Sequence, residues 1–187
     1  MLVDAQGGLL DSVTYGAQIL QFSIGWDQLS RGWGLCHPTP GRPNEIALLS
    51  DPSRARINEW LAVANQAYDS DFVELLNPTG LPLDIGGFYL TDAPVTAQAL
   101  CQLPPLTFIG GHDVLVLQAD GKKAPGHVDF KLSSDGEMIG LFAGDLTRVD
   151  MVQFGDQSAD VSQGRSTDVP ELYRFFDIPS PDEMNAP

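Results

Sequence analysis

Apolar and polar residues alternate in short stretches along most of the chain, and glycine, proline or Asp-Gly turns separate these stretches. Residues 128–132, 152–154 and 13–15 each have apolar side chains at every second position. Such alternation predicts strands that turn one face to a core and the other to water. Residues 114–117 are apolar throughout, which predicts a strand that is buried on both faces.

Three further apolar stretches, at residues 72–76, 88–90 and 138–142, complete the predicted strands. Residues 58–67 are rich in alanine but lack a sustained helical stripe, so we expect a strand at the start of this stretch. The 19 glycines and 14 prolines are spread along the whole chain, which suits many short strands joined by turns. The sequence therefore predicts an all-β protein whose simplest architecture is a two-sheet sandwich.

The last part of this pattern is present twice. Residues 11–18 recur 139 positions later, and the Ser-x-Gly of Ser23 and Gly25 recurs at the same offset as that of Ser162 and Gly164. A Pro-x-Pro sequence followed by asparagine also recurs, with an offset of 141. Repetition at a nearly constant offset is the signature of tandem modules.

We therefore expect three parts: residues 1–44, the C-terminal fragment of a preceding module; residues 45–55, a linker; and residues 56–187, a complete module with its own core. Met1 aligns with Gly140 in mid-module, so we expect any export signal to lie upstream of this segment. The fragment has apolar side chains but only roughly a third of a module. We expect it to dock on the complete module or to exchange strands with the same segment of another chain.

Composition narrows the possible partners. The formal net charge is −15 and the isoelectric point is near 4.2, so nucleic-acid binding by charge neutralisation is not expected. No apolar run approaches the ~20 residues that span a bilayer, so we expect no membrane span. Cys36 and Cys101 occupy non-equivalent parts of the repeat, which indicates two unpaired thiols.

Two groups of acidic residues are candidates for chemistry. Glu74 lies inside a predicted strand, where it is either a catalytic acid or, as we prefer, a structural carboxylate that accepts hydrogen bonds from the backbone or from Asn58. Asn77 precedes a proline and is expected to form a turn. Asp69 and Asp71 could contribute to a calcium site, but an Asp-x-Asp pair alone is more typical of a solvated loop.

Tryptophans and the repeated Ser-x-Gly sequence also need an interpretation. Trp26, Trp33 and Trp60 either form a sugar-stacking platform or, more commonly, fill a sandwich core. Because Ser162 and Gly164 have counterparts in the first copy, they indicate a shared structural need. We expect a hydroxyl that caps a turn and a glycine with unusual dihedral angles.

Several motifs in order resemble the lamin-tail domain family, at residues 57–62 (I-N-E-W-L-A), 71–77, 83–92 (L-D-I-G-G-F-Y-L-T-D), 130–137, 150–165 and 178–181. The resemblance covers nearly all of residues 56–185, and the closing third again in residues 1–44. It implies an immunoglobulin-like β-sandwich with an extra N-terminal β fragment, in which Glu74, Asn77, Asp92, Ser162 and Gly164 are structural motif positions. One departure concerns residues 180–182, where Ser-Pro-Asp replaces the Thr-Pro-Gly of the first copy.

The family is present in nuclear lamins and in bacterial secreted or surface proteins, often in tandem. The chain has no heptads of a coiled-coil rod, so the nuclear role fits poorly. Tandem repetition, the all-β pattern and the lack of a convergent catalytic set predict a non-catalytic interaction or structural module of a larger bacterial secreted or cell-surface protein. Its expected role is adhesion, spacing or partner docking, with neighbouring repeats and a protein or cell-surface partner. No catalytic residue and no cofactor are expected. The alternatives are a calcium- or carbohydrate-binding β-sandwich, and an accessory domain of a hydrolase whose catalytic domain lies elsewhere.

Overall fold

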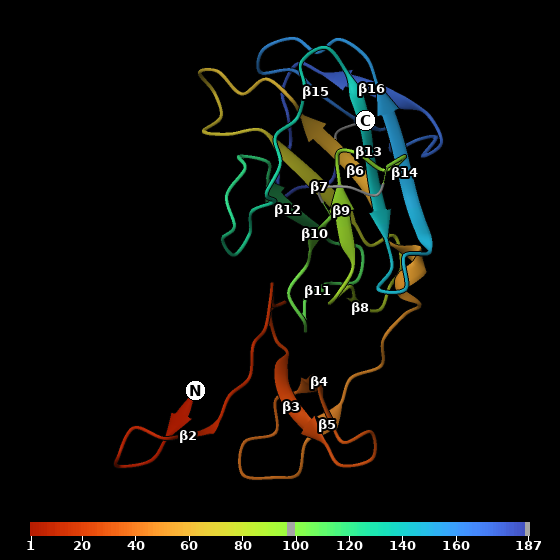
Figure 1. The fold of residues 1–187 in the computed structure, drawn as a ribbon. Coiled ribbons are helices and arrows are strands. Elements are labelled where there is room, and N and C mark those ends of the chain that lie inside the picture. Colours follow the sequence, from red (N-terminus) through yellow and green to blue (C-terminus); the bar gives the residue numbers. More distant parts are fainter. Residues whose placement is uncertain (97–99, 186–187) are drawn as a thin grey trace.

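The computed structural model spans the whole chain and describes residues 1–96 and 100–185. Strands account for 37% of the residues and helix for 2%, all strand pairs are antiparallel, and the all-β prediction is confirmed. The described residues include no helix with the length and hydropathy of a membrane span. Figure 1 shows a large β-structured body and a smaller N-terminal part that meet at a narrow waist.

The N-terminal part contains two small sheets. One pairs β1 (Leu2–Val3) with β2 (Leu9–Asp11), and the other has the order β3 (Ser23–Asp27), β4 (Gly32–His37), β5 (Glu45–Ile46). The third strand of the second sheet comes from the predicted linker, because β5 pairs with the end of β4. The rest of the linker holds a single turn of 3₁₀ helix, η1 (Pro52–Arg54), whose N-terminus is capped by Asp51. The linker is therefore structured at both ends.

The body contains two larger sheets and a ribbon. The first sheet has the order β12 (Val114–Gln118), β7 (Phe72–Leu76), β6 (Arg56–Leu61), β15 (Ser162–Arg165), β16 (Tyr173–Phe176). The second has the order β10 (Cys101–Gln102), β9 (Tyr89–Thr91), β13 (Glu137–Phe142), β14 (Arg148–Phe154). The ribbon pairs β8 (Leu83–Asp84) with β11 (Phe108–Ile109).

The core lies between the two larger sheets and is sandwich-like. Trp60 of β6 is fully buried and contacts Phe154 of β14, with ring centroids 5.5 Å apart. Leu75 of β7 belongs to the same apolar cluster. Alternation in β14 follows the prediction, since Val152 and Phe154 are buried while Gln153 is exposed. The alternation of apolar and polar residues therefore predicts correctly which face of β14 lies on the core.

Two segments that were predicted as strands, residues 128–132 and 13–15, do not form strands. Val128, Phe130 and Leu132 are buried, as the alternation predicts, but the segment makes only isolated bridges and no ladder. Residues 13–15 form no strand, and Tyr15 is 58% exposed. The equivalent residues of β14 pair with β13, and no described strand takes that place beside residues 13–15. Alternation thus predicts which side chains seek a core, but strand formation also needs a partner.

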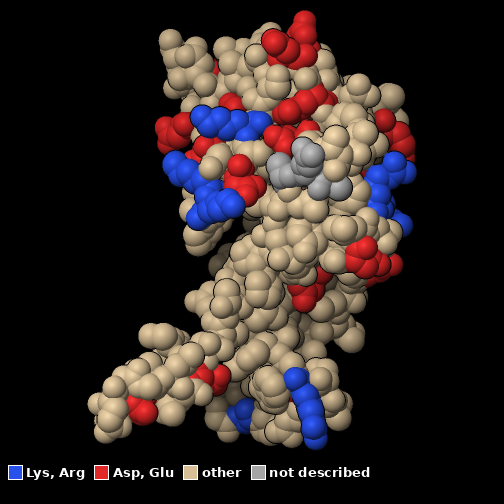
Figure 2. Space-filling view, viewed as in Figure 1, with Lys and Arg blue, Asp and Glu red and all other residues tan. Residues whose placement is uncertain are grey.

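Charge is distributed unevenly over the molecule. Residues 1–44 contain three of the 25 acidic residues, so the body has most of the negative charge. Figure 2 shows acidic and basic side chains gathered on the body, whereas the waist is mostly uncharged on this face.

Candidate functional site: the junction between the two repeats

The hairpin of β3 and β4 is paired in the same register as the hairpin of β15 and β16. Ser23 lies opposite Cys36 and Gly25 opposite Gly34, as Ser162 lies opposite Phe176 and Gly164 opposite Arg174. The repeat seen in the sequence is therefore also a repeat in strand pairing.

Side-chain hydrogen bonds are repeated as well. Asn44 Nδ2 donates to Trp26 O at 3.1 Å, and Asn185 Nδ2 donates to Arg165 O at 2.7 Å. Both members of each pair are equivalent in the two copies. Gln18 and its counterpart Gln157 likewise each donate to the carbonyl oxygens one and two residues before them. Equivalent residues thus perform equivalent local tasks in the two copies.

The first copy also retains the turns and the bulge of the second. The β1–β2 pair shifts register between Leu2 and Val3, as β13–β14 does at the equivalent positions. Positive φ angles recur in three equivalent pairs, which are Gly7 and Leu146, Gln21 and Asp160, and Gly41 and Asp182.

The pair of Gly41 and Asp182 explains how residues 180–182 form a turn although Ser-Pro-Asp replaces the Thr-Pro-Gly of the first copy. Arg42 N donates to Thr39 O, and Glu183 N donates to Ser180 O, both at 3.0 Å. Because Asp182 adopts the positive φ of Gly41, the same turn forms in both copies. Aspartate tolerates this conformation better than most non-glycine residues.

The N-terminal part contacts the body through a short backbone ladder. Gly16 N donates to Pro105 O at 2.9 Å, and Phe108 N donates to Ala17 O at 2.9 Å. Gln18 Nε2 adds a bond to Leu106 O at 2.8 Å. This ladder joins residues 16–18 to the loop that leads into β11, so the first of the two expected arrangements, docking on the body, is present.

An apolar cluster lies beside this ladder. Leu35 of β4, Ala47 after β5 and Phe108 of β11 are buried against one another. Four partly buried side chains surround them, namely Ile19, Phe22, Ile24 and Leu106. The predicted linker therefore contributes directly to the junction through Ala47.

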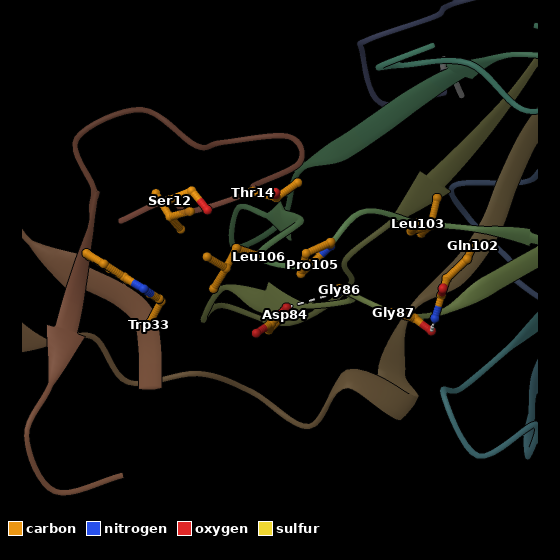
Figure 3. Close-up of a pocket in the computed structure, with 11 residues that line it drawn as sticks. Ser12, Thr14, Trp33, Asp84, Gly86, Gly87, Gln102, Leu103, Pro105 and Leu106 are labelled. Atoms are coloured by element: carbon orange, nitrogen blue, oxygen red, sulfur yellow. Dashed lines mark hydrogen bonds between the residues drawn. The ribbon is translucent and has the colours of Figure 1, made fainter. Parts of the chain in front are cut away.

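A cleft of about 640 Å³ opens at the same junction, as Figure 3 shows. Val13 and Trp33 line it from the N-terminal part, and Asp84, Gln102 and Leu103 line it from the body. The Asp84 carboxylate accepts a hydrogen bond from Gly86 N at 2.9 Å, and burial raises its pKa. Trp33 is 39% exposed, and its indole forms an edge-to-face pair with Trp26 at 5.7 Å. The cleft thus combines an aromatic wall with a few polar groups.

Glu74 lines neither the cleft nor the apolar cluster of this junction, and it is fully buried. Its Oε1 accepts from Asn58 Nδ2 at 2.7 Å, the contact that the sequence suggested, and its Oε2 accepts from Asp182 N at 2.9 Å. Burial outweighs these bonds and raises the pKa of Glu74 to about 8. A neighbouring carboxylate, Glu59, accepts from Ser180 N at 3.1 Å and from Ser180 Oγ at 2.9 Å. These carboxylates hold the C-terminal tail against β6 and β7.

Two expectations about the Ser-x-Gly sequence are wrong in their physical reason. The Ser162 hydroxyl donates to the buried Glu59 carboxylate and does not cap a turn. Gly164 does not have a positive φ, but a Cβ there would lie 2.7 Å from Asn58 O and 3.1 Å from Glu59 Cα. Glycine is therefore needed because the backbone of β6 approaches closely, not because of its dihedral angles.

The remaining motif positions have separate places. The buried Asn77 amide donates to Leu81 O at 2.8 Å and to Gly110 O at 2.6 Å, and its oxygen accepts from Thr79 N, so it organises the turn before β8. Asp92 follows β9 and is half-buried, and burial raises its pKa. Neither residue reaches the junction cleft.

Asp69 and Asp71 line a small cavity of about 220 Å³ together with Asp120 and Lys131. Asp71 Oδ1 accepts from Ala64 N at 2.8 Å, and burial raises the pKa of Asp71 although the nearby Lys131 favours its charged form. Among the residues that the structure describes, no group of three or more His, Cys, Asp or Glu side chains could hold a metal ion.

The sequence did not predict the residues that form the junction, nor the contacts by which Glu59 and Glu74 hold the C-terminal tail. Nothing in the sequence marks Phe108 as a junction residue, because a single aromatic residue between turns is equally typical of an ordinary core position. Glu59 and Ser180 were not singled out, although Glu59 lies within the Asn-Glu-Trp motif. The repeated asparagines at 44 and 185 were visible in the sequence, and their equivalent hydrogen bonds show that the repeat itself was the useful signal.

Comparison with known proteins adds no assignment. A scan against models of known protein families finds no match, and a search of curated proteins finds none with significant similarity.

Proposed function

We propose that this chain is a non-catalytic interaction and spacing module from a tandem array of lamin-tail-like, immunoglobulin-like β-sandwiches in a secreted or cell-surface protein. The observation that carries the proposal is the docked first hairpin, which has the register of the second hairpin and packs on the body through Leu35 and Phe108. A contact of this kind sets the spacing and orientation of consecutive modules in an array.

The buried carboxylates support a structural role over a catalytic one. Glu59 and Glu74 are fully buried, and their oxygens accept hydrogen bonds from Asn58, Ser162, Ser180 and the tail backbone. A catalytic acid must reach its substrate, either directly or through one water molecule. These two side chains instead bind the end of their own module, and the acidic surface suits a soluble module.

Pulsed electron resonance between two spin labels tests the spacing role. Labels at Leu29→Cys in the first hairpin and Ile178→Cys in the tail, with Cys36→Ala and Cys101→Ala, use two exposed positions in the two parts. The proposal predicts one narrow distance distribution, which Phe108→Ala broadens. A broad distribution with Phe108 intact would contradict the spacing role.

A further inference from the structure

We propose that a second cleft, the side cleft of the body, binds an extended segment of a partner protein through an arginine side chain. The side cleft opens between residues 100–104 and residues 123–129, and the arginine binds to the Asp129 carboxylate. The inference deepens the proposed interaction role, on which it rests, because it names the chemistry of one partner.

The side cleft lies wholly within the body and has a volume of about 450 Å³. Residues 100–104, which include β10, line it, and so do residues 123–127, Asp129 and Leu117 of β12. β10 and β12 are outer strands of the two larger sheets. The side cleft is therefore found where an edge of each sheet meets a loop. Its volume is typical of clefts that hold a ligand or a few side chains.

β10 offers a pair of backbone groups to a strand in the side cleft. Leu103 N donates to Phe88 O at 2.8 Å, so the backbone groups of Leu103 face the side of β9. Backbone groups alternate in direction along a strand, so the N–H and C=O of Gln102 face away from β9. β10 is the outermost strand of its sheet, and no described segment forms a backbone hydrogen bond with Gln102 on that side. An extended segment can therefore pair with β10 at Gln102.

Asp129 identifies the side chain that such a segment would bring. Lys123 Nζ lies 3.4 Å from Asp129 Oδ2, and the Lys123 side chain is 84% exposed. Asp129 Oδ1 is buried and has no hydrogen-bond partner among the described residues. A buried carboxylate oxygen without a donor is unfavourable. A guanidinium group donates to both oxygens of a carboxylate at once, so an arginine would satisfy Oδ1 as well as Oδ2.

The surroundings of Asp129 favour a cation over a neutral donor. Burial raises the pKa of Asp92, and the charge of Asp129 raises it further, so these two carboxylates repel each other. Burial also raises the pKa of the Cys101 thiol, which therefore stays neutral beside Asp129 at pH 7. A guanidinium group at Asp129 would relieve the repulsion between the carboxylates.

Lys123 is the intramolecular competitor that the partner's arginine displaces. Exposed ion pairs contribute little to stability, so the Lys123 side chain can leave Asp129 at low cost. The neighbouring Lys122 pairs with Asp120 instead, and it does not line the side cleft. The two lysines therefore have the same charge on adjacent residues, but only Lys123 competes for Asp129.

The test measures the alkylation rate of Cys101 in the full chain with Cys36→Ala, which leaves Cys101 as the single thiol. The probe is the synthetic peptide acetyl-T-V-R-V-T-amide. The proposal predicts that saturating peptide slows alkylation at least ~10-fold, because the bound segment covers the cleft that Cys101 lines. Lysine in place of the peptide's arginine should weaken binding several-fold, because it cannot donate to both oxygens in the same way.

Substitutions of the two lysines give different expectations. Lys123→Ala should tighten peptide binding several-fold, because it removes the competitor for Asp129. Lys122→Ala is the matched control, which removes the same charge but leaves the pair of Lys123 and Asp129, and binding should stay within about twofold. Asp129→Asn should weaken binding at least ~10-fold. If Asp129→Asn also lowers the melting temperature, the exposed Lys123 keeps the test decisive.

Three results would overturn the proposal. The first is no protection of Cys101 at millimolar peptide. The second is an equal effect of Lys123→Ala and Lys122→Ala, because the peptide would then respond only to overall charge. The third is equal protection by free arginine amide, because the side cleft would then bind a small cation and not an extended segment.

The spin-label measurement keeps this test separate from the proposed function. A narrow distance distribution in a chain that binds no peptide would overturn the side-cleft site and leave the spacing role intact. A broad distribution would contradict the spacing role whether or not the peptide binds.

Discussion

The two hairpins of this molecule share their pairing and differ in their surroundings. Among the described strands, β15 pairs with β6 on the side away from β16, whereas β3 has no neighbour on the side away from β4 and β4 pairs instead with β5. Leu35 is 1% exposed against Phe108, but its counterpart Phe175 is 58% exposed. The comparison teaches that register, turns and caps belong to the local sequence, whereas burial depends on the neighbour that each hairpin finds.

The largest expected contrast is between Leu35 and Phe175. Leu35→Ala should destabilise the docked hairpin by about 2–5 kcal/mol, because it leaves a cavity beside Phe108. Phe175→Ala should change stability by less than about 0.5 kcal/mol, because the side chain lies on the surface. Thermal melting with hydrogen exchange as a local readout measures both. Equal losses from the two substitutions would show that the hairpins have equivalent surroundings.

The pH dependence of the body tests the contacts by which the Glu59 and Glu74 carboxylates hold the C-terminal tail beside the second hairpin. The pKa of Glu74 is raised from its ordinary value near 4.5 to about 8 in the fold, so the folded state holds a proton that the unfolded state has lost. The resulting stability is fully present below about pH 4.5 and is lost as pH rises toward 8, a decline on the order of a few kcal/mol.

Denaturant unfolding at a series of pH values measures this decline, and Glu74→Gln is the control. The variant cannot ionise at this position, so its stability should depend much less on pH between 4.5 and 8. A decline of the same size in the variant would assign the effect to another group.

Alanine substitutions of two equivalent glycines should show that β6 packs closely on β15 but that no backbone packs as closely on β3. Gly164→Ala should cost about 1–3 kcal/mol, because its Cβ would meet the backbone of β6 at Asn58 O and Glu59 Cα. Gly25→Ala should cost less than about 1 kcal/mol, because its nearest atoms belong to the Cys36 and Asn44 side chains, which can move. Urea unfolding compares the two. A larger loss at Gly25 would show that a rigid strand already covers the edge of β3.

The smallest expected contrast concerns the repeated asparagines. Asn185 is buried and bonds both Arg165 O and Asn58, so Asn185→Ala should cost about 1–3 kcal/mol. Asn44 is exposed and has the single bond to Trp26 O, so Asn44→Ala should cost about 0.5 kcal/mol. Melting temperatures of the two variants measure the difference. Similar losses would mean that Asn44 is held by a partner as Asn185 is.

The sequence predicts the local parts of this structure well. The strand at the start of residues 58–67 and the buried face of β14 follow from their patterns, and the repeat predicts equivalent hairpins. The segment at 128–132 misled strand prediction, because its buried side chains are held without a ladder. The junction could not be predicted, because Phe108, Ala47 and Leu35 are far apart in sequence and no pattern links them.

The Ser-x-Gly sequence shows a different limit. Its repetition predicts a structural role for Ser162 and Gly164, and the structure places both at the contact with β6. The reason for the glycine was not predictable, because close approach of a strand and a positive φ leave the same mark in a sequence. Only the coordinates of Asn58 and Glu59 distinguish the two.

Amide hydrogen exchange of the full chain tests the central claim most directly, since it compares equivalent residues of the two hairpins in one experiment. The account predicts that Gly25 and Gly164 are both protected, because each faces its own hairpin partner, and that Gln163 is protected by β6. Leu35, which lies opposite Ile24, turns its backbone groups toward Ala47, so the amide of Ile24 faces away from β4, where no described strand lies. Ile24 should therefore exchange at least ~100-fold faster than Gln163. Protection of Ile24 equal to that of Gln163, or an unprotected Gly25, would contradict the account.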